Sequence, residues 1–174
     1  AGQVVSDLLN ELKGKVTAVN QEGLDSPSRQ ALSNEFDAIR SQLETVVSSA
    51  AFNGTNLIES GSQDLKVLSD ASGSTISVSA QDFSSAGLGI DEISLGTFAS
   101  AVSARTSIDS AIEQATSGLA ELGSSAQRLE GQSDFASRLG DIQNQGLGNL
   151  VAADLGEESA NLIAEQVKQE LGIK

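Results

Sequence analysis

The stretch that decides the fold is "QVVSDLLNELKGKVTAV", residues 3–19, near the start of this 174-residue chain. Its apolar residues recur at alternating spacings of four and three, at Val5, Leu9, Leu12, Val16 and Val19. This spacing is typical of a narrow apolar seam on a helix that packs almost parallel to its neighbours. It predicts a long helix in a bundle or coiled coil, rather than a strand or part of a compact mixed core.

A strong break follows the first helix in "NQEGLDSPSRQ", residues 20–30. Gly23 ends the apolar pattern, Ser26 is suited to cap the next helix, and Pro27 is suited to its first turn because its missing N–H would be unpaired there anyway. A second helix is therefore expected to begin at this point.

The same seam returns twice further along the chain. The second helix carries it at Leu32, Phe36, Ile39, Leu43, Val46 and Ala50. The third, from about residue 99, carries it at Ile108, Ile112, Ala115, Leu119, Leu122, Ala126 and Leu129, and is expected to continue through Leu139 and Ile142. Successive strict seams favour helices that pack side by side.

The middle of the chain has strand character. "LKVL" (65–68) and "TISVSA" (75–80) are rich in β-formers, and "SDASGS" (69–74) between them supplies turn residues. We expect a hairpin over residues 64–80. The Ser- and Gly-rich stretches "ESGSQD" (59–64) and "SSAGLGIDEISLG" (84–96) are expected to form loops.

A lone aromatic precedes a strong turn signal in "AFNG", residues 51–54. Asn53 and Gly54 both tolerate positive φ and can reverse the chain toward the hairpin. Phe52 is expected to plug the end of the helical seam as a core residue.

The last part of the chain is predicted to contain a break in the third helix, followed by a final helix. "QNQGLGN", residues 143–149, is expected to interrupt the third helix with its two glycines. The final helix has an apolar stripe with no cover in its own rod, and it is a candidate partner or polymerisation helix. The stripe consists of Leu150, Leu155, Leu162, Ile163, Val167 and Leu171.

Composition excludes several functions. The 24 acidic and 10 basic residues give a net charge of -14, which repels nucleic acid and anionic lipid. No apolar run approaches the roughly 20 residues that span a bilayer. Histidine and cysteine are absent, so the usual general base, nucleophile partner and metal ligands are missing. We expect no enzyme activity, no cofactor and no metal site.

Two motifs that suggest binding sites have simpler explanations. "GLGID" and "GLGNL" lack the G-x-G-x-x-G pattern of phosphate-binding loops and are read as turns. Asp154, Glu157 and Glu158 lack EF-hand spacing, and acidic residues are favourable near a helix start.

Three stretches resemble bacterial flagellin, most closely the alphaproteobacterial type. They are "FNGTNLI" (52–58), "LKVLSDASGSTISVSA" (65–80) and "GLGNLVAADLGEESANLIAEQVKQELG" (146–172). The resemblance implies a mainly α fold: an elongated rod of long antiparallel helices in a coiled-coil-like bundle with a small β-hairpin region. It implies a rod domain over 1–149, formed jointly by 1–98 and 99–149, and the start of an inner terminal helix over 150–174.

The resemblance also implies a function. Such a chain is a secreted structural subunit of the extracellular flagellar filament, which assembles with other flagellin subunits for motility. An export chaperone and hook-associated proteins are further implied partners. Both ends look trimmed, since outermost terminal helices of the family lie beyond this stretch. The alternatives are a hook-filament junction protein and a cell-surface binding module, but a sugar-binding module would need Tyr or Trp platforms, which this chain lacks.

One partner is expected to be lost. In activating flagellins the vertebrate innate flagellin receptor reads an Arg- and Glu-bearing face of the first rod helix. Here Lys13 and Lys15 flank Gly14 at the matching place, and no Arg occurs before Arg29. Lysine lacks the planar fork of arginine, and glycine costs a helix about 1 kcal/mol relative to alanine. We expect weak or no receptor activation.

Overall fold

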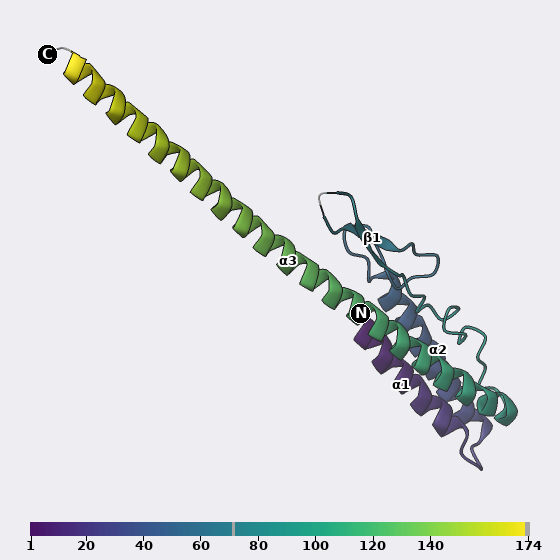
Figure 1. Cartoon of the computed structure of the whole chain (residues 1–174). Helices are drawn as coiled ribbons and strands as arrows, with labels where there is room; N and C mark the ends of the chain where they lie inside the picture. Colours follow the sequence, from purple (N-terminus) through teal and green to yellow (C-terminus); the bar gives the residue numbers. More distant parts are fainter. Residues whose placement is uncertain (71, 173–174) are drawn as a thin grey trace. The chain divides into compact units, whose positions relative to one another are not determined.

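The computed structural model describes residues 1–70 and 72–172. Its elements in chain order are α1 (Gly2–Val19), α2 (Ser26–Ser48), β1 (Leu65–Leu68), β2 (Thr75–Val78) and α3 (Phe98–Gly172), as Figure 1 shows. The mainly helical fold with one small hairpin agrees with the prediction. Residues 71, 173 and 174, which the expected hairpin and terminal segment include, lie outside the described residues.

The chain forms two compact units, Ala1–Gln127 and Arg128–Lys174. α3 contributes its first part to the first unit and its later part to the second. The expected interruption at residues 143–149 is wrong, because α3 runs through them without a break. A helical glycine costs about 1 kcal/mol relative to alanine but leaves the backbone hydrogen bonds intact, so Gly146 and Gly148 weaken the helix without ending it. The domain boundary at residue 149 stays a prediction.

Three helices of the first unit lie side by side, namely α1, α2 and the first part of α3 (Figure 1). α1 runs antiparallel to α3. Lys13 forms an ion pair with Asp109 at 2.7 Å, and the side-chain amide of Asn20 donates to the carbonyl of Ala101 at 3.0 Å. All five seam residues predicted for α1 are completely buried in the core.

The cap of α2 differs from the prediction. Asp25, not Ser26, precedes the helix, and its carboxylate accepts a hydrogen bond from the N–H of Ser28 at 2.9 Å. Hydrogen bonding from the side chain and backbone of Ser28 lowers the pKa of Asp25. A carboxylate caps better here because it forms a charge-assisted bond and also interacts favourably with the helix dipole. Pro27 lies in the first turn, as predicted.

The seam of α2 drifts by one residue toward its end. Val47 is buried, whereas Val46 is only partly buried against the core. Leu32 is also partly buried, and the central seam residues Phe36, Ile39 and Leu43 are buried as expected. A straight helix turns about 20° per heptad away from a strict seven-residue repeat, so the buried face moves from one valine to the next.

The buried face of α3 consists mainly of small residues, which the prediction did not anticipate. Ile108 and Ala115 are buried as predicted. Three other residues of the predicted seam are only partly buried and pack against the side of the core: Ile112, Leu119 and Leu122. Leu129, which belongs to the second unit, is also partly buried. Ala126, Leu139 and Ile142 are exposed. The buried residues of α3 are Ala101, Ala104, Ile108, Ala111, Ala115, Gly118 and Ser125. Small residues let helix backbones approach closely, while larger neighbours close the sides.

Irregular segments supply the rest of the core. Ile58, Phe83, Leu88, Ile90 and Leu95 are all at most 6% exposed, although none of them lies in a helix or strand. The stretch 84–96 is therefore a loop, as expected, but a loop that packs its apolar side chains inward.

The hairpin pairs β1 and β2 antiparallel. Leu65 lies opposite Val78, and Val67 lies opposite Ile76. Side chains alternate between less and more exposed positions along both strands, as in a sheet with one covered face.

Candidate functional site

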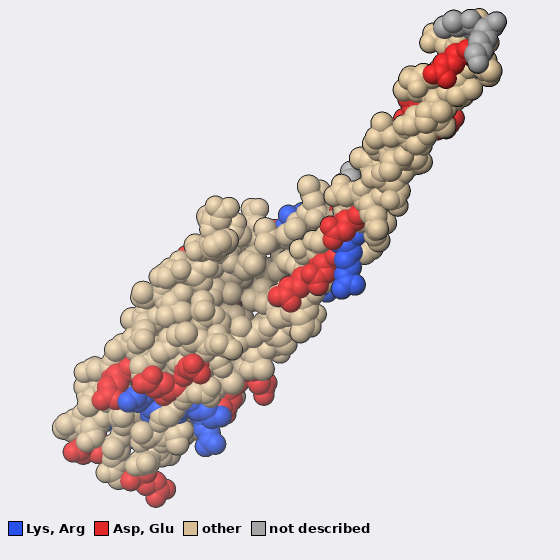
Figure 2. All heavy atoms as spheres, turned by 90° about the vertical axis from the view of Figure 1, so that its left-hand side faces the viewer, with Lys and Arg blue, Asp and Glu red and all other residues tan. Residues whose placement is uncertain are grey.

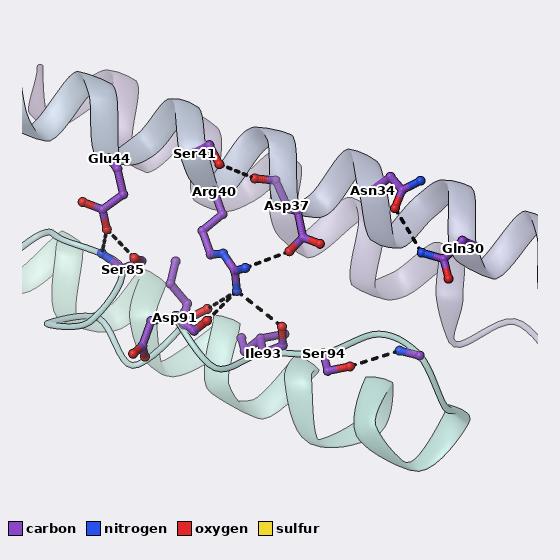
Figure 3. Close-up of polar contacts among 12 residues, drawn as sticks. Gln30, Asn34, Asp37, Arg40, Ser41, Glu44, Ser85, Asp91, Ile93 and Ser94 are labelled. Carbon is purple, nitrogen blue, oxygen red and sulfur yellow. Dashed lines mark hydrogen bonds and ion pairs between the residues drawn. The ribbon is translucent and has the colours of Figure 1, made fainter.

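Two charged residues of α2 anchor the irregular segment that follows the hairpin, as Figure 3 shows. The guanidinium of Arg40 donates to the backbone carbonyls of Ile90 at 3.3 Å and Asp91 at 2.6 Å. One turn further along α2, the carboxylate of Glu44 accepts from the backbone N–H of Ser85 at 2.6 Å and from its hydroxyl. Together they hold residues 85–91 against the helix.

Arg40 is itself held in place by its own helix. It forms an ion pair with Asp37 at 2.8 Å, and its guanidinium carbon lies 5.9 Å from the centre of the Phe36 ring. A planar guanidinium can bind several carbonyls and stack on a ring at once, which a lysine cannot do. Sequence reasoning missed this anchor, because charged residues four apart on a helix reveal nothing about a partner 50 residues away.

The turn after α2 forms as a tight reversal. Asn53 and Gly54 adopt φ of 51° and 79°, and the backbones of Phe52 and Thr55 exchange hydrogen bonds of 2.9 and 3.0 Å. The predicted packing role of Phe52 is wrong, because its side chain is 85% exposed.

Other residues close the end of the α2 seam in place of Phe52. The side-chain amide of Asn56 donates to the carbonyl of Val47 at 2.8 Å and accepts from the N–H of Ile58 at 3.0 Å. Val47 and Ile58 are both buried. Asn56 thus satisfies a backbone carbonyl near the helix end and directs Ile58 into the core, which leaves Phe52 outside it.

The second unit presents exposed apolar side chains on α3. The six residues of the predicted polymerisation helix are between 49% and 71% exposed: Leu150, Leu155, Leu162, Ile163, Val167 and Leu171. The acidic residues Asp154, Glu157 and Glu158 lie well inside α3, so their predicted role at a helix start is wrong.

Acidic side chains and fewer basic ones appear on the face that Figure 2 shows, with several of opposite sign next to each other. Lys13 pairs with Asp109, and Lys15 pairs with Glu35 at 2.6 Å. The hydrogen bond to Glu35 raises the pKa of Lys15. Both lysines that flank Gly14 therefore have an acidic partner.

The described residues contain no group of three or more acidic, histidine or cysteine side chains placed to hold a metal ion. Over the same residues, no helix combines the length and the apolar character needed to cross a membrane.

Comparison with known proteins identifies related sequences at both ends of the chain. Residues 1–64 match the bacterial flagellin N-terminal helical region, and residues 106–174 match the bacterial flagellin C-terminal helical region. Flagellin FljK of Caulobacter vibrioides is 38% identical over 177 residues and covers 100% of this chain. A flagellin of Brucella melitensis is 29% identical over 184 residues and covers 98% of it.

The chain spans 64% of the length of each of these two relatives. The crystal structure of Bacillus cereus flagellin superposes with a TM-score of 0.66 at 24% identity, over 74% of this chain and 76% of that one. At this identity the likeness concerns the fold. Since the flagellin N- and C-terminal regions both match and the fold agrees with them, the chain belongs to the bacterial flagellin family.

Proposed function

We propose that this chain is the core part of a structural subunit of the bacterial flagellar filament, exported and assembled outside the cell. Its flagellin N- and C-terminal regions carry this proposal, because α1 and the first part of α3 come from the two regions and pack together in one core. A rigid subunit that presents the same surfaces to successive copies builds an open helical polymer, and motility follows from the mechanics of that polymer.

The proposed assignment of roles is the one that the resemblance to flagellin implies. Residues 1–149 form the rod domain, from 1–98 and 99–149 jointly, and residues 150–174 begin the inner helix. The exposed leucines of that helix are its proposed subunit contacts, because apolar side chains in such number on one helix mark an interaction surface.

The test uses the full-length protein that carries this chain. Leu155 and Leu162 lie seven residues apart, and replacing both by serine should prevent filament formation in electron micrographs. Circular dichroism should still report a folded rod. Asn161→Ser, between them on the same helix but turned about 100° away from Leu162, is the matched control and should leave assembly unchanged. Filaments of normal length from the double variant would contradict the proposed role of this helix.

Further partners follow from the same proposal. An export chaperone would cover the exposed apolar residues of 150–171 before assembly, by binding an amphipathic helix in a groove. Hook-associated proteins would cap or join the filament through the same surfaces.

Weak or absent activation of the innate flagellin receptor is also proposed. Lys13 and Lys15 are engaged with Asp109 and Glu35, and neither offers the planar fork of an arginine. A reporter-cell assay with full-length protein checks this, and a strong nanomolar response would overturn it.

A further inference from the structure

Asn53 differs from the other asparagines of this chain. It is the only one of eight that glycine follows in the sequence. Asn144, Asn149 and Asn161 lie within α3. The side chains of the remaining four take part in hydrogen bonds: Asn10, Asn20, Asn34 and Asn56.

The side-chain amide of Asn53 and the backbone nitrogen of Gly54 are both open to solvent. Both residues are exposed, and among the described residues neither group has a hydrogen-bond partner. A Cβ placed on Gly54 would meet no atom within 4 Å. Because glycine has no Cβ of its own, nothing on residue 54 hinders the approach of its nitrogen to the neighbouring side chain.

We propose that Asn53 is a site of spontaneous deamidation through a cyclic imide. The nitrogen of Gly54, after losing its proton to solvent, attacks Cγ of Asn53 and forms a new N–C bond. The bond from Cγ to Nδ2 then breaks, and the side-chain nitrogen leaves as ammonia with a proton from solvent. Water opens the ring at either carbonyl, giving aspartate or a β-linked isoaspartate. The net change is one water consumed and one ammonia released.

The turn controls access to this reaction. Ring closure needs the peptide between Asn53 and Gly54 to leave the tight reversal, which the two hydrogen bonds between Phe52 and Thr55 hold in place. An exposed turn with so few hydrogen bonds opens at a small free-energy cost compared with global unfolding. The reaction therefore proceeds from the briefly opened turn of an otherwise folded protein.

The two products affect the turn differently. Aspartate keeps the backbone and adds one negative charge, and it tolerates the left-handed conformation nearly as well as asparagine. Isoaspartate inserts an additional methylene into the backbone between Phe52 and Thr55. The paired hydrogen bonds of 2.9 and 3.0 Å then no longer fit, and the exposed Phe52 changes position.

Peptide mapping of the intact folded chain tests the proposal. After incubation in mildly alkaline buffer, the tryptic peptide of residues 41–66 should show conversion of Asn53 but not of Asn56. Asn56 is an internal control in the same peptide, because its amide is bonded to the carbonyl of Val47. Labelling by an isoaspartyl methyltransferase should appear in the same peptide and be absent from an Asn53→Ser variant.

A synthetic peptide of residues 48–58 provides the rate of the unrestrained reaction. Slower conversion in the folded chain than in this peptide, with complete retention at Asn56, is the expected result. If Asn53 keeps its amide until the synthetic peptide has reacted fully, or if Asn56 converts equally fast, the proposal is wrong.

Discussion

Replacing Gly118 by alanine tests a tight packing contact between α3 and Phe83. A Cβ on Gly118 would lie 2.7 Å from Cε1 and 2.8 Å from Cζ of Phe83. The Phe83 ring is 2% exposed, and the backbone N–H of Phe83 donates to the carbonyl of Ile58 at 3.0 Å. The ring is enclosed and its backbone is tied, so neither can move away without disturbing the core.

Two opposing effects set the size of the change. Alanine in place of glycine inside a helix stabilises it by about 1 kcal/mol. Forcing an extra methyl group into a filled core costs about 1–3 kcal/mol. We expect Gly118→Ala to lower the free energy of unfolding by up to about 2 kcal/mol, because the packing cost is the larger of the two.

Gly123→Ala on the same helix separates these effects, because a Cβ there meets nothing within 4 Å. This control should gain up to about 1 kcal/mol from helix propensity alone. Urea unfolding followed by circular dichroism measures both variants. Adding Phe83→Leu to Gly118→Ala should recover part of the lost stability, because the effects of substitutions at residues in direct contact are not additive. If Gly118→Ala is as stable as Gly123→Ala, the ring does not press on α3 here.

Three further changes test other parts of the first unit. Leu12→Ala, at a fully buried position, should lower the free energy of unfolding in urea by about 2–5 kcal/mol. Val4→Ala, at a position that is 43% exposed on the same helix, should lower it by about 0.5 kcal/mol. Equal losses of stability would contradict the buried seam of α1. Arg40→Lys should speed amide hydrogen exchange in residues 85–91, because lysine lacks the planar guanidinium that binds the carbonyls of Ile90 and Asp91. An unchanged exchange rate would contradict the anchoring role of Arg40. Hydrogen bonds, foremost from Ser72, lower the pKa of Asp70 from 3.8 to about 2. The ionised form therefore stabilises the hairpin loop above pH 3.8, and this contribution disappears as pH falls through about 2; an NMR titration midpoint near 3.8 would refute it.

Local patterns in the sequence determined the helical class, the α1 seam, the hairpin and the family resemblance. Each depends on residues that are close together in the chain. The spacing of Val5, Leu9 and Leu12 places them on one side of any helix, whatever its neighbours are. Asn53-Gly54 favours positive φ through its own backbone preferences, so the turn was also predictable.

Only the tertiary structure decided which residues occupy the centre of each packed face. Val46 and Val47 are neighbours of the same kind, and the position of the adjacent helices selects Val47 for burial. On α3 the small residues Ala111 and Gly118 are buried, whereas Leu119 only packs against the side of the core. Periodicity predicts a face, but its exact centre depends on the crossing geometry.

Phe52 and Phe83 show most clearly that the burial of a side chain depends on the tertiary structure. Phe52 follows a long seam and looked like a core plug, yet it is 85% exposed, whereas Phe83 lies in a Ser-rich loop and is 2% exposed. The difference comes from contacts distant in sequence. Asn56 closes the end of α2 without Phe52, while Gly118 on α3 leaves the space that the Phe83 ring fills. A side chain's burial depends on whether another part of the chain leaves room for it, and that information exists only once the chain has folded.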